Sequence, residues 1–175
     1  RLAVAEVANY LVSLGHRRIG YIAGPPGFSS AIERLAGFRE ALEARGAPIA
    51  GELIVDGGYT YESGVAGAEK LLALNPRPTA IFASNDEMAA GVYRVANRLG
   101  LSIPGDLSIV GFDDGPLAAR LLPSLTTIRL PIRELGRLAA NKILHPEAAR
   151  GTHAMVTPLE PHLVIRDSCQ PTSRA

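Results

Sequence analysis

Two stretches, TAIFASND at residues 79–86 and LSIVGFDD at residues 107–114, each consist of an apolar run that ends in two polar residues. Continuous apolar runs with β-branched and aromatic residues are typical of strands buried on both faces of a parallel sheet. In open α/β sheets, ligands bind in the crevice beyond the carboxyl ends of such strands. The two polar pairs therefore predict a site for one small polar ligand.

The rest of the chain alternates between helical and strand-like patterns. Helical periodicity covers residues 2–14 and ends at Gly15, an expected C-cap, while Ser30 and Glu33 have the spacing of a capping box that opens a helix ending near Gly46. We expect further strands at residues 18–23, 52–55, 125–129, 152–157 and 162–166, a short helix ending at Leu122, and frayed last residues. Strands separated by helices imply right-handed βαβ units. The predicted fold is therefore α/β, an open parallel sheet with helices on both faces.

The composition is that of an ordinary globular protein, with 175 residues of which 47% are hydrophobic and 20% charged. Eighteen basic residues balance 17 acidic ones, so the net charge of +1 gives no electrostatic footprint for nucleic acid or an anionic membrane. No apolar stretch approaches the roughly 20 residues that span a bilayer. The single Cys169 excludes an internal disulfide and fits a reducing compartment, which predicts a cytoplasmic protein.

The usual signatures of enzymes are missing from the sequence. It contains no G-x-G-x-x-G after a strand, P-loop, H-E-x-x-H or G-x-S-x-G motif, and its four histidines share no metal-ligand spacing. Asp113 and Asp114 are adjacent strand residues that point to opposite faces, so they do not form a catalytic dyad. We expect no catalytic residue, no cofactor and no metal, and an α/β enzyme that uses Asp113 is the weakest alternative.

Five short segments occur in an order that points to one family: LGHRRI at 14–19, RLAGF at 34–38, NDEMAAG at 85–91, VGFDD at 110–114 and LTTI at 125–128. Together they resemble the effector-binding region of lactose-repressor-type (LacI/GalR) bacterial transcription regulators, which share the periplasmic-binding-protein fold. In that family this region is the C-terminal lobe of a two-lobed domain that holds its ligand in the cleft between the lobes.

The resemblance implies a division of the chain. Residues 1–128 and 158–168 would form the C-terminal lobe, residues 129–157 would belong to the other lobe, and residues 169–175 would be a tail. The DNA-binding helix-turn-helix and most of the N-terminal lobe would precede Arg1, so operator DNA would be bound only through that missing part. The implied function is control of operator binding by a small effector, such as a sugar or nucleoside, with a periplasmic solute receptor of a transporter as the alternative.

Asn85 and Asp86, which follow the strand predicted within residues 79–86, have different predicted roles. The amide of Asn85 can donate and accept hydrogen bonds, which suits a hydroxyl-bearing ligand. Helix capping is the structural alternative, and it suits Asp86 better because the helix is expected to begin at Glu87. We therefore predict a ligand contact for Asn85 and a cap for Asp86.

The resemblance aligns Arg34 with the cleft arginine of the family and Asp113 with an acid that hydrogen-bonds the effector. A planar guanidinium suits paired hydroxyls or a carboxylate. The structural alternative for Arg34 is a solvated surface arginine. The alternative for Asp113 is a turn residue that bonds its own backbone, a role that suits Asp114 better.

Aromatic and small residues complete the predicted site. Tyr59 matches a position where the family often places an aromatic side chain, which can stack on a sugar or base, with ordinary packing as the alternative. Phe28 and Ser30 lie in the cleft loop and are candidate ligand contacts. An equal alternative is that Phe28 anchors the loop and that Ser30 is the N-cap of the following helix. His16, which follows a helix end, is expected to be structural.

A further set of apolar residues is assigned to a homodimer interface by the resemblance, with local core packing as an equal alternative: Leu117, Leu121, Leu122 and Ala90. The apolar stripe of the helix after Pro131 needs burial against its own lobe or a second copy of the chain.

Overall fold

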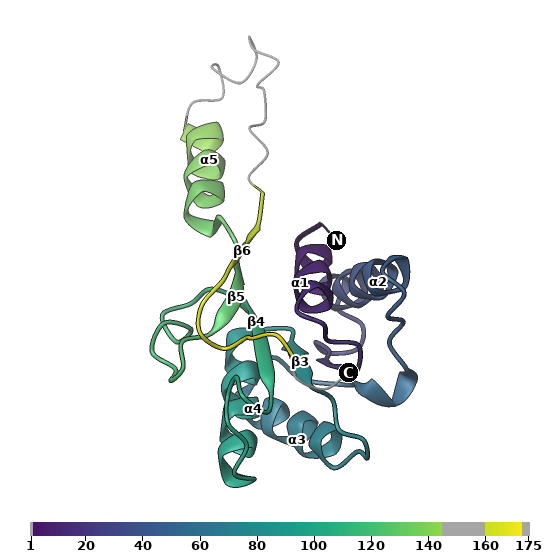
Figure 1. The fold of residues 1–175 in the computed structure, drawn as a ribbon. Coiled ribbons are helices and arrows are strands. Elements are labelled where there is room, and N and C mark those ends of the chain that lie inside the picture. Colours follow the sequence, from purple (N-terminus) through teal and green to yellow (C-terminus); the bar gives the residue numbers. More distant parts are fainter. Residues whose placement is uncertain (1, 145–159, 173–175) are drawn as a thin grey trace.

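The strands of the computed structural model form one six-stranded sheet (Figure 1). The structure describes residues 2–144 and 160–172. The strand order is β2-β1-β3-β4-β5-β6, with β1 Ile19–Ile22, β2 Ile54–Val55, β3 Ala80–Ala83, β4 Ser108–Asp113, β5 Thr126–Arg129 and β6 His162–Val164. Strands β1 to β5 are parallel as predicted, but β6 is antiparallel to β5. The prediction of a fully parallel sheet is wrong at this edge, because the chain leaves and re-enters the sheet at the same end of β5.

Helices cover both faces of the sheet, as predicted (Figure 1). Helices α1 (Leu2–Ser13) and α2 (Ser29–Ala44) pack on one face, and helices α3 (Tyr61–Leu72) and α4 (Asp86–Arg98) pack on the other. Alternate strand residues supply the two cores, since Tyr21 points into the first and Ile22 into the second. The first core is centred on the rings of Tyr21, Phe38 and Phe82, whose centroids lie 5.0–5.3 Å apart.

The helix boundaries follow local capping chemistry, with one exception to the prediction. Helix α1 ends as expected at Gly15, whose φ is +88°, and the amide of His16 donates to the carbonyl of Leu11. The capping box predicted for Ser30 is wrong, because α2 begins one residue earlier and Phe28 occupies the N-cap position without a side-chain hydrogen bond. A capping box is present instead at Thr60, which opens α3.

Helices α3 and α4 approach each other closely because each contributes a glycine to the contact. A Cβ added at Gly64 would lie 2.3 Å from the carbonyl oxygen of Met88, and one added at Gly91 would lie 2.6 Å from the carbonyl oxygen of Tyr61. Contacts this short leave no space for any larger side chain at either position. The close contact fixes the start of α4, where the predicted ligand residue Asn85 lies.

Three local predictions from the sequence are wrong. Residues 51–53 form a 3₁₀ turn, so β2 is reduced to residues 54–55. The segment before Leu122 forms turns rather than a helix, because the two prolines Pro116 and Pro123 leave too few residues between them for a stable helix. The prediction of frayed last residues is wrong for residues 169–172, since the amide of Thr172 donates to the carbonyl of Leu14 at 2.9 Å, and residues 173–175 lie outside the described residues.

Helix α5 (Ile132–Leu144) stands apart from the sheet (Figure 1). None of its residues is buried, and its apolar side chains Ile132, Leu135 and Ile143 are 61%, 58% and 78% exposed. The strand predicted for residues 152–157 lies outside the described residues. The boundaries predicted for the segment 129–157 remain a prediction, although α5 shares no core with the lobe.

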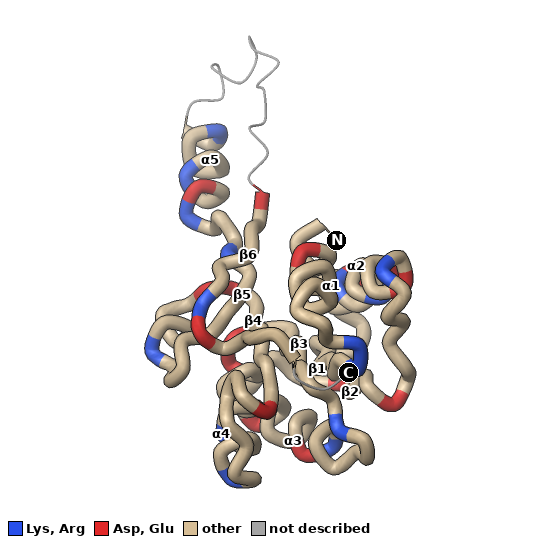
Figure 2. The backbone as a smooth tube through the Cα atoms, in the orientation of Figure 1, with Lys and Arg blue, Asp and Glu red and all other residues tan. Residues whose placement is uncertain are grey.

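Charges of both signs are interspersed along the chain (Figure 2). Helix α5, for example, carries Glu134 in its first turn and Lys142 in its last. This distribution agrees with the net charge of +1. No helix in the described part of the chain is long and apolar enough to cross a membrane.

Candidate functional site

Arg34 lies where the carboxyl ends of the central strands meet the first turns of α2. Its guanidinium donates to the carbonyl of Ser84 at 2.6 Å. The Cζ atom lies 3.7 Å from the centroid of the Phe112 ring and 5.8 Å from that of Tyr59. Stacking on Phe112 fixes the plane of the guanidinium, so its remaining N–H groups are held in one orientation. Arg34 is therefore placed to donate several hydrogen bonds to a bound group.

Tyr59 forms an aromatic wall beside Arg34. Its φ of +60° is unusual for a residue other than glycine and turns the side chain back over the start of the β1–α2 loop. A Cβ added at Gly24 would lie 2.3 Å from the Tyr59 hydroxyl, so a glycine is required beneath the ring. The ring of Phe28 meets that of Tyr59 edge to face at 6.3 Å. The buried hydroxyl of Tyr59 has no hydrogen-bond partner among the described residues.

Asn85 caps helix α4, the role predicted for Asp86. Its Oδ1 accepts a hydrogen bond from the amide of Met88 at 2.9 Å, and its Nδ2 donates to the carbonyl of Tyr59 at 2.9 Å. The prediction that Asp86 is the cap is wrong, because Asp86 is already the first residue of the helix. The amide of Asn85 retains one N–H and one lone pair for a ligand, so its predicted ligand contact is neither supported nor contradicted by this geometry.

Asp86 is a buried carboxylate whose role was missed in the sequence. Its oxygens accept hydrogen bonds from the Thr127 hydroxyl at 2.6 Å and from the Gly115 amide at 2.8 Å, and the residue is 4% exposed. Burial raises its pKa to about 6; the two hydrogen bonds oppose that rise, and the nearby carboxylates of Asp113 and Asp114 add to it. The carboxylate joins α4 to β5 and to the loop after β4.

Asp113 and Asp114 follow one another through an unusual backbone turn, with φ values of +118° and +55°. Asp113 reaches the surface, yet removal of water from around its carboxyl group raises its pKa, and the Arg34 guanidinium opposes that rise. Asp114 was expected to bond its own backbone in a turn, but its side chain is buried and forms ion pairs with Arg129 and Arg166 instead. The structure therefore places Asp113 near Arg34 and directs Asp114 into the protein.

Two grooves open beside these residues. One, of about 420 Å³, is lined by Leu2, Ala3, Val4, Ser30, Glu33, Arg34, Phe112 and Pro161. The other, of about 780 Å³, is lined by Asp113, Asp114, Arg129, Leu130, Pro131, Ile132, Arg133, Glu134, Glu160 and His162. Of the predicted ligand residues, Ser30 and Arg34 share the first groove and Asp113 lies in the second. Phe28, Tyr59 and Asn85 lie outside both linings, and Phe28 and Asn85 each contact Tyr59.

The residues assigned to a dimer interface differ in exposure. Leu122 is 88% exposed, whereas Leu117 and Leu121 are half-buried. Ala90 is 8% exposed and packs within its own lobe. Leu122 thus has the most surface to offer a partner, and the interface itself remains a prediction.

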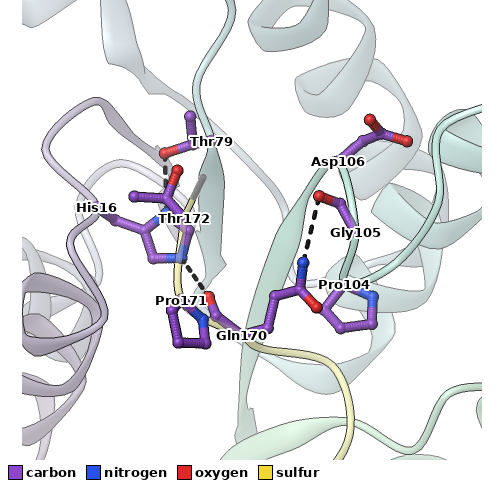
Figure 3. A pocket seen from close by; sticks show the side chains of 8 residues that line it. All are labelled: His16, Thr79, Pro104, Gly105, Asp106, Gln170, Pro171 and Thr172. Carbon is purple, nitrogen blue, oxygen red and sulfur yellow. Dashed lines mark hydrogen bonds between the residues drawn. The ribbon is translucent and has the colours of Figure 1, made fainter. Parts of the chain in front are cut away.

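A second, much smaller hollow of about 10 Å³ lies at the amino ends of the strands (Figure 3). His16 occupies its wall, hydrogen-bonded to the Thr79 hydroxyl at 2.8 Å, the Ser108 hydroxyl at 3.1 Å and the carbonyl of Gln170 at 3.2 Å. Burial lowers the pKa of His16. This histidine is structural as predicted, although it bonds neighbouring strands and the C-terminal segment rather than the carbonyls of the preceding helix.

Within residues 2–144 and 160–172, no group of three His, Cys, Asp or Glu side chains is arranged to hold a metal ion. The predicted ligand residues at the carboxyl ends of the strands instead offer the guanidinium of Arg34, the amide of Asn85 and the carboxyl group of Asp113. The aromatic rings of Tyr59 and Phe28 lie beside them. Such a set recognises hydroxyl groups and flat apolar faces.

Known proteins match nearly the whole chain. Residues 8–169 match the periplasmic binding protein-like domain family. The ribose operon repressor of Haemophilus influenzae is 40% identical over 158 residues, which are 90% of this chain and 48% of the repressor. The structure of a transcriptional regulator CelR–cellobiose complex superposes with a TM-score of 0.84 at 36% identity, over 95% of this chain and 51% of that one. A dimeric Lac repressor with a C-terminal deletion gives a TM-score of 0.86 at 30% identity, over 97% and 61%.

The chain spans about half the length of the curated relatives it matches. These relatives are transcriptional regulators, so the solute-receptor alternative is not favoured. The match over residues 8–169 confirms the resemblance carried by the five sequence segments. The chain therefore belongs to the periplasmic binding protein-like domain family, in the form that LacI-type transcriptional regulators carry.

Proposed function

We propose that this chain is the effector-binding lobe of a bacterial transcriptional regulator, and that its effector binds at the carboxyl ends of β3 and β4. The observation that carries the proposal is the position of Arg34, whose guanidinium stacks on the ring of Phe112, the residue before Asp113. A cation and an anion held at the same sheet end can bond adjacent hydroxyl groups of one ligand. Asn85 adds an amide, and Tyr59 and Phe28 add aromatic faces.

The effector is a sugar or a nucleoside-like molecule. Rings with several hydroxyls match paired donors and acceptors, and their flat faces match an aromatic wall. A structural neighbour is described as a complex with cellobiose, which supports the sugar class. Ser30 is the remaining predicted contact, and it lines the same groove as Arg34.

The cleft closes against a second lobe to which residues 129–157 contribute, while residues 1–128 and 158–168 form the lobe described here. Ligand that favours the closed arrangement shifts the population toward it. In the complete protein this shift controls binding to operator DNA, which contacts a separate DNA-binding part. The regulator acts in the cytoplasm as a homodimer, with Leu122 at the interface.

Isothermal titration calorimetry of the complete gene product tests the proposal, with cellobiose, ribose and cytidine as probes. We expect one of them to bind, and Arg34→Ala to weaken that binding by about 100-fold, because charge-assisted hydrogen bonds contribute about 1.5–3 kcal/mol each. Arg39→Ala is the matched control, since Arg39 lies on the same helix and is exposed.

Unchanged affinity in the Arg34→Ala protein would remove this residue from the site. Failure of all three probes to bind to the wild-type protein would count against the sugar and nucleoside classes. A loss of affinity equal in Arg39→Ala would show that charge on α2, rather than the geometry of Arg34, determines binding.

A further inference from the structure

The loop that begins where β4 ends at Asp113 has a backbone conformation that needs support from its surroundings. Asp113 and Asp114 both have positive φ, +118° and +55°, and neither is a glycine. Backbone in such sparsely populated regions persists only where neighbouring groups hold it, and it concentrates at binding sites. The question is which groups hold this loop in place.

Asp114 provides the main support. Its carboxylate is 4% exposed and binds two arginines, Arg166 through one oxygen and Arg129 through the other. The Arg166 side chain is 18% exposed and also donates to the carbonyl of Leu125 at 2.7 Å, so it is fixed independently of Asp114. A buried carboxylate paired on both oxygens has little freedom to move.

A second support holds the next residue. The amide of Gly115 donates to the buried carboxylate of Asp86 at 2.8 Å. The loop is therefore held on one side by α4 and on the other by the arginines. Asp113, the last residue of β4, lies next to these anchors, is exposed and lines the larger groove.

The two arginines lie at the strands that connect the lobe with α5, Arg129 within β5 and Arg166 just after β6. Arg129 is the last residue of β5, which leads to α5, and Arg166 follows β6, which returns from the segment beyond it. These strands are paired, with Arg129 opposite His162. One carboxylate thus joins the ligand loop to both connecting strands.

We propose that Asp114 is a positioning residue for the effector, which acts through Asp113 by fixing the loop against Arg129 and Arg166. The inference rests on the proposed function, in which Asp113 contacts the ligand. Asp114 itself does not touch the effector, since both of its oxygens are bound to arginines.

The first test measures the loop without ligand, by amide hydrogen exchange of the complete gene product. Asp114→Asn removes the charge and keeps the shape, and we expect the exchange of the Gly115 amide to become about tenfold faster. Arg129→Gln, which removes the more exposed partner, should give a smaller increase. Asp167→Asn is the control. Asp167 follows Arg166 in the sequence, is exposed, and accepts a hydrogen bond from the hydroxyl of Ser124 rather than from the loop. Unchanged exchange at Gly115 in Asp114→Asn would overturn the proposal.

The second test is a double-mutant cycle on the affinity for whichever of cellobiose, ribose and cytidine binds to the wild type. We expect Asp114→Asn to weaken binding about tenfold in the wild-type background and less than about twofold in an Asp113→Asn background, because its effect passes through Asp113. An equal loss in both backgrounds would overturn the positioning role. Absence of binding by the wild type would overturn the proposed function instead, and the exchange result would still decide whether Asp114 holds the loop.

Discussion

The two ends of the same parallel sheet are built in opposite ways. At the amino ends of the strands, His16 is bonded at both ring nitrogens and the C-terminal segment covers the hollow beside it. At the carboxyl ends, Asp113 and Asp114 have positive φ and the buried hydroxyl of Tyr59 has no partner among the described residues. The first end is closed and satisfied, and the second retains strain and unused polar groups.

This difference separates stability from binding. Polar groups that bond one another stabilise a fold, whereas groups held apart from partners remain available to a ligand. Substitutions at the amino end should therefore change the free energy of unfolding and leave affinity unchanged, whereas substitutions of exposed polar groups at the carboxyl end should mainly change affinity.

The largest effect on stability should come from His16→Ala. The substitution removes the hydrogen bonds that His16 makes with the hydroxyls of Thr79 and Ser108 and opens a cavity, which should lower the free energy of unfolding by about 3 kcal/mol. Denaturant unfolding measures this loss, and calorimetry should find the affinity for a bound sugar unchanged. A large fall in affinity in a folded His16→Ala protein would break the separation of the two ends.

The pH dependence of stability should have opposite signs at the two ends. The pKa of Asp86 is raised to about 6 from its ordinary 3.8, so its contribution to stability is fully present below pH 3.8 and is lost as the pH rises through about 6. The pKa of His16 is lowered by burial, so its contribution is present above its ordinary value of 6.5 and is lost as the pH falls below it.

Asp86→Asn isolates the first of these effects. Because one pKa unit corresponds to 1.36 kcal/mol, the stability of the wild type relative to this variant should fall by about 2–3 kcal/mol between pH 4 and pH 7. Denaturant unfolding at several pH values provides the measurement. A relative stability that stays flat over this range would mean that Asp86 titrates in the folded protein as it does in the unfolded chain.

Tyr59→Phe should have the smallest effect on stability. It removes a buried hydroxyl that lacks a partner among the described residues, so the free energy of unfolding should stay constant or rise by up to about 1 kcal/mol. A ligand that uses this hydroxyl would bind more weakly to the variant, which calorimetry would detect. Clear destabilisation would instead indicate that the hydroxyl is already satisfied, for example by water.

The sequence predicted the architecture well because the signals are local. Apolar runs, glycine caps and helix periodicity identify the five parallel strands and the helices on both faces. Arg34 lies beside the strand ends, and its ligand contact stays a prediction. The errors concern residues whose roles depend on distant partners. Asp86 was assigned to capping because Thr127, which binds its carboxylate, is 41 residues away.

The same reason explains why the support of the Asp113 loop could not be read from the sequence. Aspartate is a common turn residue, so the sequence predicts a turn at Asp114. Its ion pair with Arg166 joins residues 52 positions apart and leaves no local signal. The direction of β6 was also missed, because an antiparallel return depends on where the intervening segment leads and not on the strand residues themselves.

The antiparallel pairing of β5 and β6 makes the whole excursion through α5 equivalent to a long hairpin loop. Arg129 lies opposite His162, and α5 has no buried residue. Replacing residues 130–161 by a two-residue Asn-Gly turn would therefore join paired ends, and among the described residues it would remove one contact with the first core, that of half-buried Leu130. The lobe has the topology of a domain that accepts large insertions at one hairpin, so its smaller, self-contained form is accessible to protein engineering.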